Sequence, residues 1–391
     1  MFDRNHQIVR RVEDRWIGFE LSQELQRVFK NRNLSAGRAQ TPTLGWIIQR
    51  YHEYRKRKDV TLVQAGDLLR LTLDGKVGEP GPATVDVVKV GEEELELSPL
   101  PPFTTDEMLR EASRILKLGA KETMALAQDL FEAGLITYHR TDSTRVSDAG
   151  LRVAREYLGD DFVPRRWGEG GAHECIRPTK PLPVEELIQY LREGLIPSEG
   201  ITRNHLRLYR LIFGRFMASQ SKQARVRRAK YVLTIADRRV DVERIEQVLV
   251  GGWSKYYPYG LRLERPLPEG PLEVEIRHLK VPGAPLYTQG DVIRLMKEKG
   301  IGRPSTYATI IDRLLTRRYV IDRKGRLFPT KRGIMVYDYL ISRYPDLVSE
   351  ERTANLEERM IAVEEGLLDY QEVLADVYSE IRSKVGGRRG G

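Results

Sequence analysis

Residues 134–143 read GLITYHRTDS, an apolar run that ends on a tyrosine and passes directly into polar residues. An ordinary phenol has a pKa of about 10 and is a weak nucleophile at neutral pH. Two positions on, the guanidinium of Arg140 can stabilise the phenolate of Tyr138 and the oxygens of an attacked phosphorus. The two residues therefore form a candidate catalytic site. A buried core tyrosine beside a helix cap is the alternative interpretation.

Around this stretch the pattern predicts helix, turn, helix, strand. One helix runs from Thr104 to Gly119, where a glycine can end it, and a second spans residues 122–133. The apolar residues 135–138 then predict a strand whose end carries the tyrosine. A further helix begins at Ser147, and its first backbone amides could bind a phosphate.

A similar order recurs near the end of the chain. Helices are predicted over residues 290–300 and 304–318, and another begins at residue 330. Between them, strands at 319–321 and 326–328 flank a turn. This is the outline of a winged helix, which often binds nucleic acid, although such units also mediate protein contacts.

Two stretches alternate apolar and polar residues with the period of two that is typical of strands. The first includes residues 84–97, and the second includes residues 231–235 and 272–276. Because they flank a helical middle, we expect one β domain into which the middle is inserted. The predicted division is 1–58 helical, 59–102 β-rich, 103–229 tyrosine-bearing, 230–282 β-rich, and 283–391 helical with a flexible basic tail.

The chain is basic, with a net charge of +9 and a pI near 9.4, and a charge of this sign attracts nucleic acid. A generic thermophile surface rich in Arg and Glu is the alternative interpretation of this composition. A single cysteine, Cys175, excludes an internal disulfide and a cysteine zinc site. No apolar run is long enough to cross a membrane and no secretory signal begins the sequence, so we expect a cytoplasmic location.

Five segments, in this order, resemble those of type IA DNA topoisomerases. Residues 10–18 resemble a helix that lines the single-strand groove, and residues 34–42 resemble a loop that holds the DNA backbone. Residues 134–143 resemble the active-site tyrosine motif. Residues 173–179 and 300–307 resemble a histidine-bearing segment and a loop of the fourth domain. The likeness extends from about residue 8 to residue 380.

The resemblance implies that Tyr138 and Arg140 are catalytic and that the other matched positions contact DNA. We expect Asp14 to orient neighbouring arginines, and His173 to be a phosphate or proton partner or else a packed structural histidine. No second histidine follows His173 at the spacing that zinc requires, so no zinc is expected. The predicted DNA-contacting residues are Arg10, Arg11, Asp14, Arg15, Ser35, Gly37, Arg38, Gln40, Thr141, Asp142, Ser143, His173, Arg177, Arg303, Ser305, Thr306 and Tyr307.

The same resemblance implies an α+β multidomain fold. It would be a type IA topoisomerase-like arch with two winged-helix-like, CAP-like helical units and a β-rich hinge domain. The implied reaction cleaves and rejoins single-stranded DNA through a 5′-phosphotyrosine. Arg140 would stabilise charge on the phosphoryl oxygens.

Members of this family begin with a Toprim domain, which carries a glutamate and an Asp-x-Asp cluster that bind Mg²⁺. This sequence starts just past that domain and offers no substitute acidic cluster. Residues 40–47 and 176–181 are more similar to reverse gyrases than to the bacterial relaxing enzymes. We therefore expect the small, tyrosine-bearing subunit of a heterodimeric reverse gyrase. Its large partner would supply Mg²⁺ through its Toprim domain, and ATP through a helicase-like ATPase.

Other interpretations stay open. The sequence could be a truncated piece of an ordinary type IA topoisomerase, or a DNA-binding scaffold without catalysis. A tyrosine recombinase also forms a phosphotyrosine, but its tyrosine normally lies near the C-terminus, unlike Tyr138.

Overall fold

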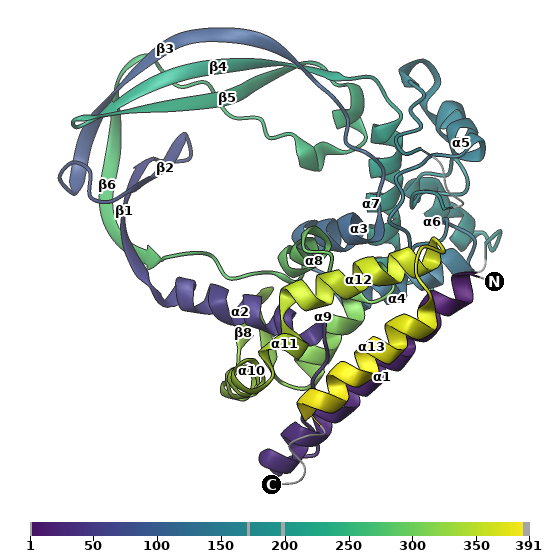
Figure 1. Cartoon of the computed structure of the whole chain (residues 1–391). Helices are drawn as coiled ribbons and strands as arrows, with labels where there is room; N and C mark the ends of the chain where they lie inside the picture. The colour runs from purple at the N-terminus through teal and green to yellow at the C-terminus, as the bar shows by residue number, and fades with distance from the viewer. Residues whose placement is uncertain (1, 170–172, 197–199, 386–391) are drawn as a thin grey trace. The chain divides into compact units, whose positions relative to one another are not determined.

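The computed structural model describes residues 2–169, 173–196 and 200–385 (Figure 1). The chain is an α+β protein that divides into two compact units. The helical unit contains Met1–His52, Leu109–Met124 and Leu286–Gly391. The sheet unit contains Glu53–Met108 and Ala125–Pro285. Each unit thus gathers segments that are far apart in the sequence.

The helical unit has three groups of elements. Its N-terminal pair is α1 (Phe2–Val28) and α2 (Gln40–Arg55), and its inserted segment holds the π-helical turn Ala112–Leu116 and the start of α4 (Ala120–Glu132). The C-terminal group contains α8 (Gln289–Glu298), α9 (Tyr307–Thr316), β7 (Val320–Arg323), β8 (Arg326–Pro329), α10 (Lys331–Arg343), α11 (Pro345–Val348), α12 (Glu350–Glu364) and α13 (Tyr370–Val385). α8, α9 and the β7–β8 hairpin follow the order of a winged helix.

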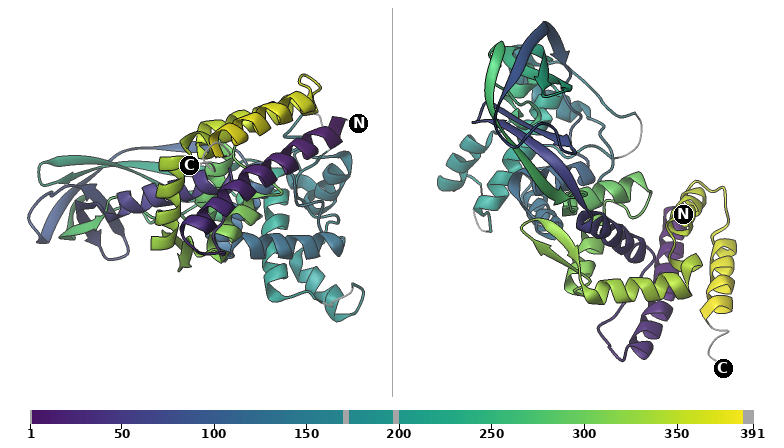
Figure 2. Two further views of the ribbon diagram at one scale, coloured as in Figure 1. Left: turned by 60° about the horizontal axis from the view of Figure 1, so that its bottom comes forward. Right: turned by 90° about the vertical axis from the view of Figure 1, so that its left-hand side faces the viewer.

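One apolar core joins these segments. On α1, Ile17, Leu21 and Leu25 recur every four residues and are buried, so they form one stripe along the helix. α12 and α13 pack beside α1, and Figure 2 shows the three helices side by side. Trp16 of α1 meets Tyr378 of α13 with ring centroids 5.2 Å apart. The ends of the chain are thereby tied together within this unit.

The sheet unit is built on a six-stranded antiparallel sheet in the order β2-β1-β6-β3-β4-β5. Strands of both β-rich stretches of the sequence share this sheet, because β6 pairs with β1 and with β3. The strands are β1 (Arg57–Ala65), β2 (Leu69–Asp74), β3 (Gly81–Leu97), β4 (Ala224–Ile235), β5 (Arg238–Val250) and β6 (Gly270–Pro282). Its helices are α3 (Thr105–Glu111), α5 (Asp148–Leu158), α6 (Val184–Arg192), α7 (Arg203–Ser219) and the 3₁₀ turns Gly159–Asp161, Gly252–Lys255 and Pro258–Gly260.

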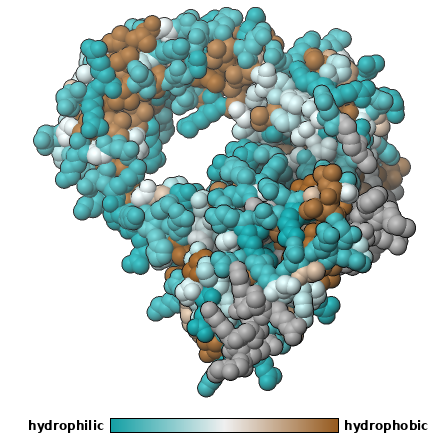
Figure 3. All heavy atoms as spheres, in the orientation of Figure 1, coloured by the Kyte–Doolittle hydropathy of each residue, from teal (hydrophilic) through white to brown (hydrophobic). Residues whose placement is uncertain are grey.

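The strands show the alternation of buried and exposed side chains that the sequence pattern predicts. On β3, Val85 and Val87 are buried in the core of the sheet unit, while Val88 and Val90 are exposed. Figure 1 shows that the sheet is long and curved. In Figure 3, apolar side chains appear along it among mostly hydrophilic ones.

The strand predicted over residues 135–138 is not formed, and this prediction was wrong. The segment is extended, but it makes only an isolated bridge between Ile136 and Pro178. Its backbone bonds run from Thr137 N to Arg177 O (2.9 Å) and from Thr179 N to Leu135 O (3.1 Å). The ladder goes no further because Arg177 N donates to the Thr137 hydroxyl (3.0 Å) instead of the Thr137 carbonyl, and that hydroxyl donates to Cys175 O (2.7 Å).

Candidate functional site

Tyr138 lies in the loop that follows α4, and the residue is 43% exposed. The chain leaves α4 at Gly134, whose φ of +69° suits glycine, and then runs extended along residues 175–179. The Thr137 hydroxyl donates to Cys175 O (2.7 Å) and accepts from Arg177 N (3.0 Å). A well-bonded segment therefore presents an exposed tyrosine, and the alternative of a buried core tyrosine is excluded.

The ring of Tyr138 rests on two neighbours. The centroid of Phe131, on α4, lies 5.4 Å away and that of His139 lies 5.6 Å away, both in edge-to-face geometry. Such pairs restrict the ring without enclosing it. The ring of Tyr138 is thus restrained by two aromatic contacts while the residue stays exposed.

His139 is fully buried, and the sequence analysis assigned it no role. Neither of its ring nitrogens has a hydrogen-bond partner within the described part of the chain. Burial lowers the pKa of His139 to about 4, and the charge of Arg140 adds to this against the opposing effect of Glu132. The imidazole is therefore neutral at pH 7. Its ring packs against that of Tyr138, and its backbone carbonyl accepts from the Thr105 hydroxyl (2.7 Å).

Arg140 is exposed, and its guanidinium reaches Gln128 Oε1 at 3.5 Å. Among the described residues it has no carboxylate partner, so its charge is available to a substrate anion. Thr141 is buried and exchanges hydrogen bonds with Thr105 (2.8 and 2.9 Å). Asp142 is exposed and Ser143 is half-buried. Thr141 thus fixes the loop, and the residues beside it face solvent.

Residues 173–177 lie beside the segment that carries Tyr138. His173 is exposed, and its carbonyl accepts from Arg145 Nε (3.2 Å). Arg177 is only 5% exposed and makes two hydrogen bonds to the Glu174 carboxylate, at 2.9 and 3.0 Å. Burial would raise the pKa of Glu174, but the hydrogen bonds from Arg177 and Ser147 outweigh it and hold the pKa below its ordinary value. Arg177 is therefore committed inside the protein.

The helix predicted to begin at Ser147 is present as α5. Ser147 caps it by accepting from Gly150 N (3.3 Å) and donates to Glu174 (2.7 Å). A Cβ on Gly150 would lie 2.8 Å from Arg177 Nε, so glycine is required there. This network positions the loop that follows the tyrosine.

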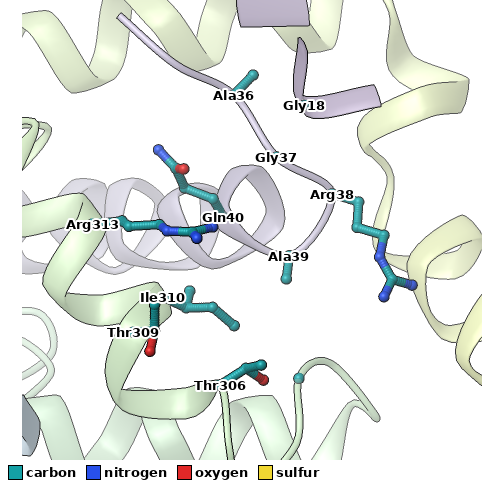
Figure 4. Close-up of a pocket in the computed structure, with 11 residues that line it drawn as sticks. Gly18, Ala36, Gly37, Arg38, Ala39, Gln40, Thr306, Thr309, Ile310 and Arg313 are labelled. Atoms are coloured by element: carbon teal, nitrogen blue, oxygen red, sulfur yellow. The ribbon is translucent and has the colours of Figure 1, made fainter. Parts of the chain in front are cut away.

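In the helical unit, a cavity of about 250 Å³ lies between the α1–α2 loop and α9 (Figure 4). Four of the predicted DNA-contacting residues line it: Gly37, Arg38, Gln40 and Thr306. Figure 4 shows the Arg313 side chain directed toward Gln40, whereas Arg38 extends away from both. The lining also includes Gly18, Ala36, Ala39, Gly302, Thr309 and Ile310.

Thr309 and Arg313 were missed by the sequence analysis. They follow Thr306 at intervals of three and four residues, which places all three on one face of α9. Gly302 has a φ of +81°, and a Cβ there would lie 3.2 to 3.3 Å from Ile310, Thr306 and Tyr307. Glycine is therefore required at the floor of the cavity.

The remaining predicted residues have various positions. Tyr307 packs in the core of the helical unit, and Arg15 and Ser305 are exposed. Ser35 exchanges backbone hydrogen bonds with the Tyr319 hydroxyl (both 2.8 Å), and Arg303 is half-buried with its amide donating to Thr306 (2.8 Å). Three residues lie on α1 with side chains outside the described part of the structure: Arg10, Arg11 and Asp14.

No group of three or more His, Cys, Asp or Glu that could hold a metal ion occurs within residues 2–169, 173–196 and 200–385. Across the same residues, no helix is long and apolar enough to cross a membrane.

The fold has a solved counterpart. Full-length topoisomerase I from Thermotoga maritima superimposes with a TM-score of 0.80 and 31% sequence identity, over 98% of this chain and 69% of that protein. The fold is thus type IA topoisomerase-like, with a curled antiparallel sheet and many helices, and the predicted fold class is confirmed.

The sequence agrees with this assignment. The model of the DNA topoisomerase family matches residues 3–64 and 75–375, so the chain belongs to that family. Over 96% of its length the chain is 52% identical to a reverse gyrase of Pyrococcus furiosus and 48% identical to reverse gyrase 1 of Aquifex aeolicus. It spans about a third of the length of these relatives (32% and 34%).

Proposed function

We propose that this chain is the tyrosine-bearing part of a type IA topoisomerase of the reverse gyrase kind. The observation that supports this most directly is the exposed Tyr138, held on a bonded segment beside the exposed Arg140. A nucleophile and a cation uncommitted to any described carboxylate are what attack on a phosphodiester requires. The likeness to reverse gyrases over nearly the whole chain supports the finer assignment.

In the proposed reaction, the Tyr138 oxygen attacks a backbone phosphorus and forms a 5′-phosphotyrosyl ester. The bond from phosphorus to the 3′ oxygen breaks, the phenol loses its proton, and the leaving 3′ oxygen gains one. Arg140 stabilises the charge on the phosphoryl oxygens. Because one phosphoester replaces another, the reverse attack by the 3′ hydroxyl rejoins the strand without an external energy source.

His139 is unsuited to take the phenolic proton directly. Its pKa of about 4 makes it a weak base, and its ring is buried. We assign it the role of holding the Tyr138 ring, together with Phe131. Proton transfer then falls to water or to a group on another polypeptide.

DNA binding is proposed for the cavity of the helical unit. Gln40, Thr306, Thr309 and Arg313 offer amide, hydroxyl and guanidinium groups, which suit backbone phosphates and sugars rather than one base. A single strand bound there would be held by contacts that read no sequence.

We also propose that a large partner subunit completes the enzyme. Its Toprim domain would bind Mg²⁺ and its helicase-like ATPase would bind ATP, and the complex would pass strands to introduce positive supercoils. The reverse gyrases that this chain matches are about three times longer, which supports the existence of further parts. Co-purification from the native organism tests this proposal, and recovery of the chain without a Toprim-bearing ATPase would contradict it.

The polarity of the covalent bond tests the proposed reaction. The chain, reconstituted with its partner, is incubated with single-stranded DNA labelled at either end, and the adduct is trapped with denaturant. We expect label on this chain only when it marks the 3′ end, because the 5′ phosphate joins Tyr138. An adduct through a 3′ phosphate would favour a recombinase-like reaction instead.

A further inference from the structure

A second cavity in the helical unit has a volume of about 460 Å³ and a basic lining. It is lined by Asn33, Thr316, Arg317, Arg318 and Arg332, so three of its five residues are arginines and none is acidic. Asn33 comes from the loop between α1 and α2, and Arg332 from the first turn of α10. Thr316 ends α9, and the next two arginines follow it.

The hydrogen bonds of these arginines go to backbone carbonyls. Arg317 Nη1 donates to Asn33 O (3.1 Å), and Arg332 Nη1 donates to Arg317 O (3.4 Å). Within the described residues, none of the three arginines has a carboxylate partner. Elsewhere in the same unit, Arg352 pairs with Glu380 (2.8 Å). Positive charges gathered around a cavity without a counter-charge favour an anion there.

The backbone conformation of Arg318 also supports an anion-binding cavity. Its φ is +56°, in the left-handed region that glycine or asparagine usually occupies just after a helix. A non-glycine residue costs on the order of 1 kcal/mol in this conformation. An arginine at a strained position beside an uncompensated basic cavity suggests that its charge is used there.

The two cavities of the helical unit lie along the same segments. Residues 306–313 of α9 line the first and residues 316–318 line the second. The middles of these stretches are about 11 Å apart by the helix rise. In the α1–α2 loop, residues 36–40 line the first cavity and Asn33 lines the second. One extended ligand can therefore contact both.

We propose that the second cavity binds a backbone phosphate of the same DNA strand that occupies the first. Guanidinium groups bind phosphate oxygens through paired hydrogen bonds and read no base. The site extends the grip on the strand beyond the first cavity. The inference rests on the proposed DNA interface and concerns binding, not cleavage.

The test measures the affinity of the full chain for fluorescent single-stranded oligonucleotides of about 4 to about 12 nucleotides at several salt concentrations. The main variant is Arg318→Ala, because alanine keeps a similar backbone cost at a positive φ. The matched control is Arg239→Ala on the exposed end of β5, which removes the same charge in the sheet unit. A triple variant, Arg317→Gln, Arg318→Ala and Arg332→Gln, is compared with one that has lysine at all three positions. Thermal unfolding checks that each variant folds.

For long oligonucleotides we expect Arg318→Ala to weaken binding about threefold or more and to reduce the salt slope by about 0.7. The triple lysine variant should retain most of the affinity. Equal affinities for Arg318→Ala and Arg239→Ala at every length would overturn the proposal. An effect seen only with duplex DNA would overturn the claim of a single shared strand.

Arg313→Ala, in the first cavity, separates this inference from the proposed function. If Arg313→Ala weakens binding and the variants of the second cavity do not, the proposed interface stands and the second site is refuted. If neither weakens binding, the interface itself is refuted.

Discussion

The tyrosine region and the first cavity of the helical unit differ in how their charged side chains are engaged. Around Tyr138, the loops are held by hydrogen bonds within the protein, and Arg177 is paired with Glu174. These contacts hold the segment that carries the exposed phenol. In the cavity, the exposed Arg313 has no side-chain hydrogen bond among the described residues, although the neighbouring Gln40 is buried. Chemistry needs one atom held accurately, whereas sequence-independent binding needs several interchangeable donors. The difference predicts that substitutions in the two regions fail in different measurements.

The largest expected effect is that of Tyr138→Phe. The change removes only the nucleophilic oxygen, so covalent adducts in the reconstituted complex should fall by about 10⁴-fold or more. DNA affinity should stay within about twofold, since the ring and its contacts with Phe131 and His139 are retained. Adduct yield and fluorescence anisotropy measure the two quantities. A parallel loss of affinity would show that the regions are not separable in this way.

The next effect concerns the framework behind the tyrosine. Glu174→Ala leaves the buried guanidinium of Arg177 without its carboxylate, and should lower the free energy of unfolding by about 3 kcal/mol. Denaturant unfolding measures the loss. Asp74→Ala, which breaks the exposed pair with Lys58, is the control and should move the midpoint little. Similar losses of unfolding free energy for both variants would show that the buried Glu174–Arg177 pair stabilises the protein no more than an exposed pair does.

A pH effect of about 3 kcal/mol should come from His139. Its pKa is about 4 when folded and higher when unfolded, so the unfolded chain binds more protons between these values. Stability from this group is therefore present above about pH 6.5 and is lost as the pH falls toward 4. His139→Phe should flatten that part of the stability–pH curve. Identical curves for the two proteins would rule out a neutral buried imidazole.

The smallest effect is expected in the cavity. Arg313→Ala should weaken binding of single-stranded DNA a fewfold and reduce the salt slope by about 0.7, because one phosphate contact is lost. Arg294→Ala on α8, where the arginine pairs with Glu298, is the control. Trapped adduct at saturating DNA should not change. A lower yield at saturation would show that this arginine affects the chemistry as well.

The sequence predicted the fold class, because ordered motifs specify a family even where single elements are ambiguous. It did not predict how residues 135–138 bond, since their partners, such as Arg177, lie some 40 positions away. Nor could a motif show which members face solvent. Thr141, Arg177 and Tyr307 were predicted as DNA contacts, and their side chains pack inside the protein.

Other features need the third dimension. The role of His139 depends on complete burial, which no local pattern reveals. Thr309 and Arg313 could have been predicted from the sequence, because their spacing from Thr306 on a predicted helix places them on one face. The basic cavity could not be predicted from the sequence, since it joins Asn33 to residues almost 300 positions later.

Cys175 has a consequence for experiment. It is the only cysteine of the chain and is fully buried, and burial raises the pKa of its thiol to about 12. The reactive thiolate is therefore almost absent at neutral pH. The native protein should therefore react little with thiol reagents. One cysteine introduced into the helical unit and one into the sheet unit could each carry a dye. The distance between the helical and sheet units could then be followed during a catalytic cycle.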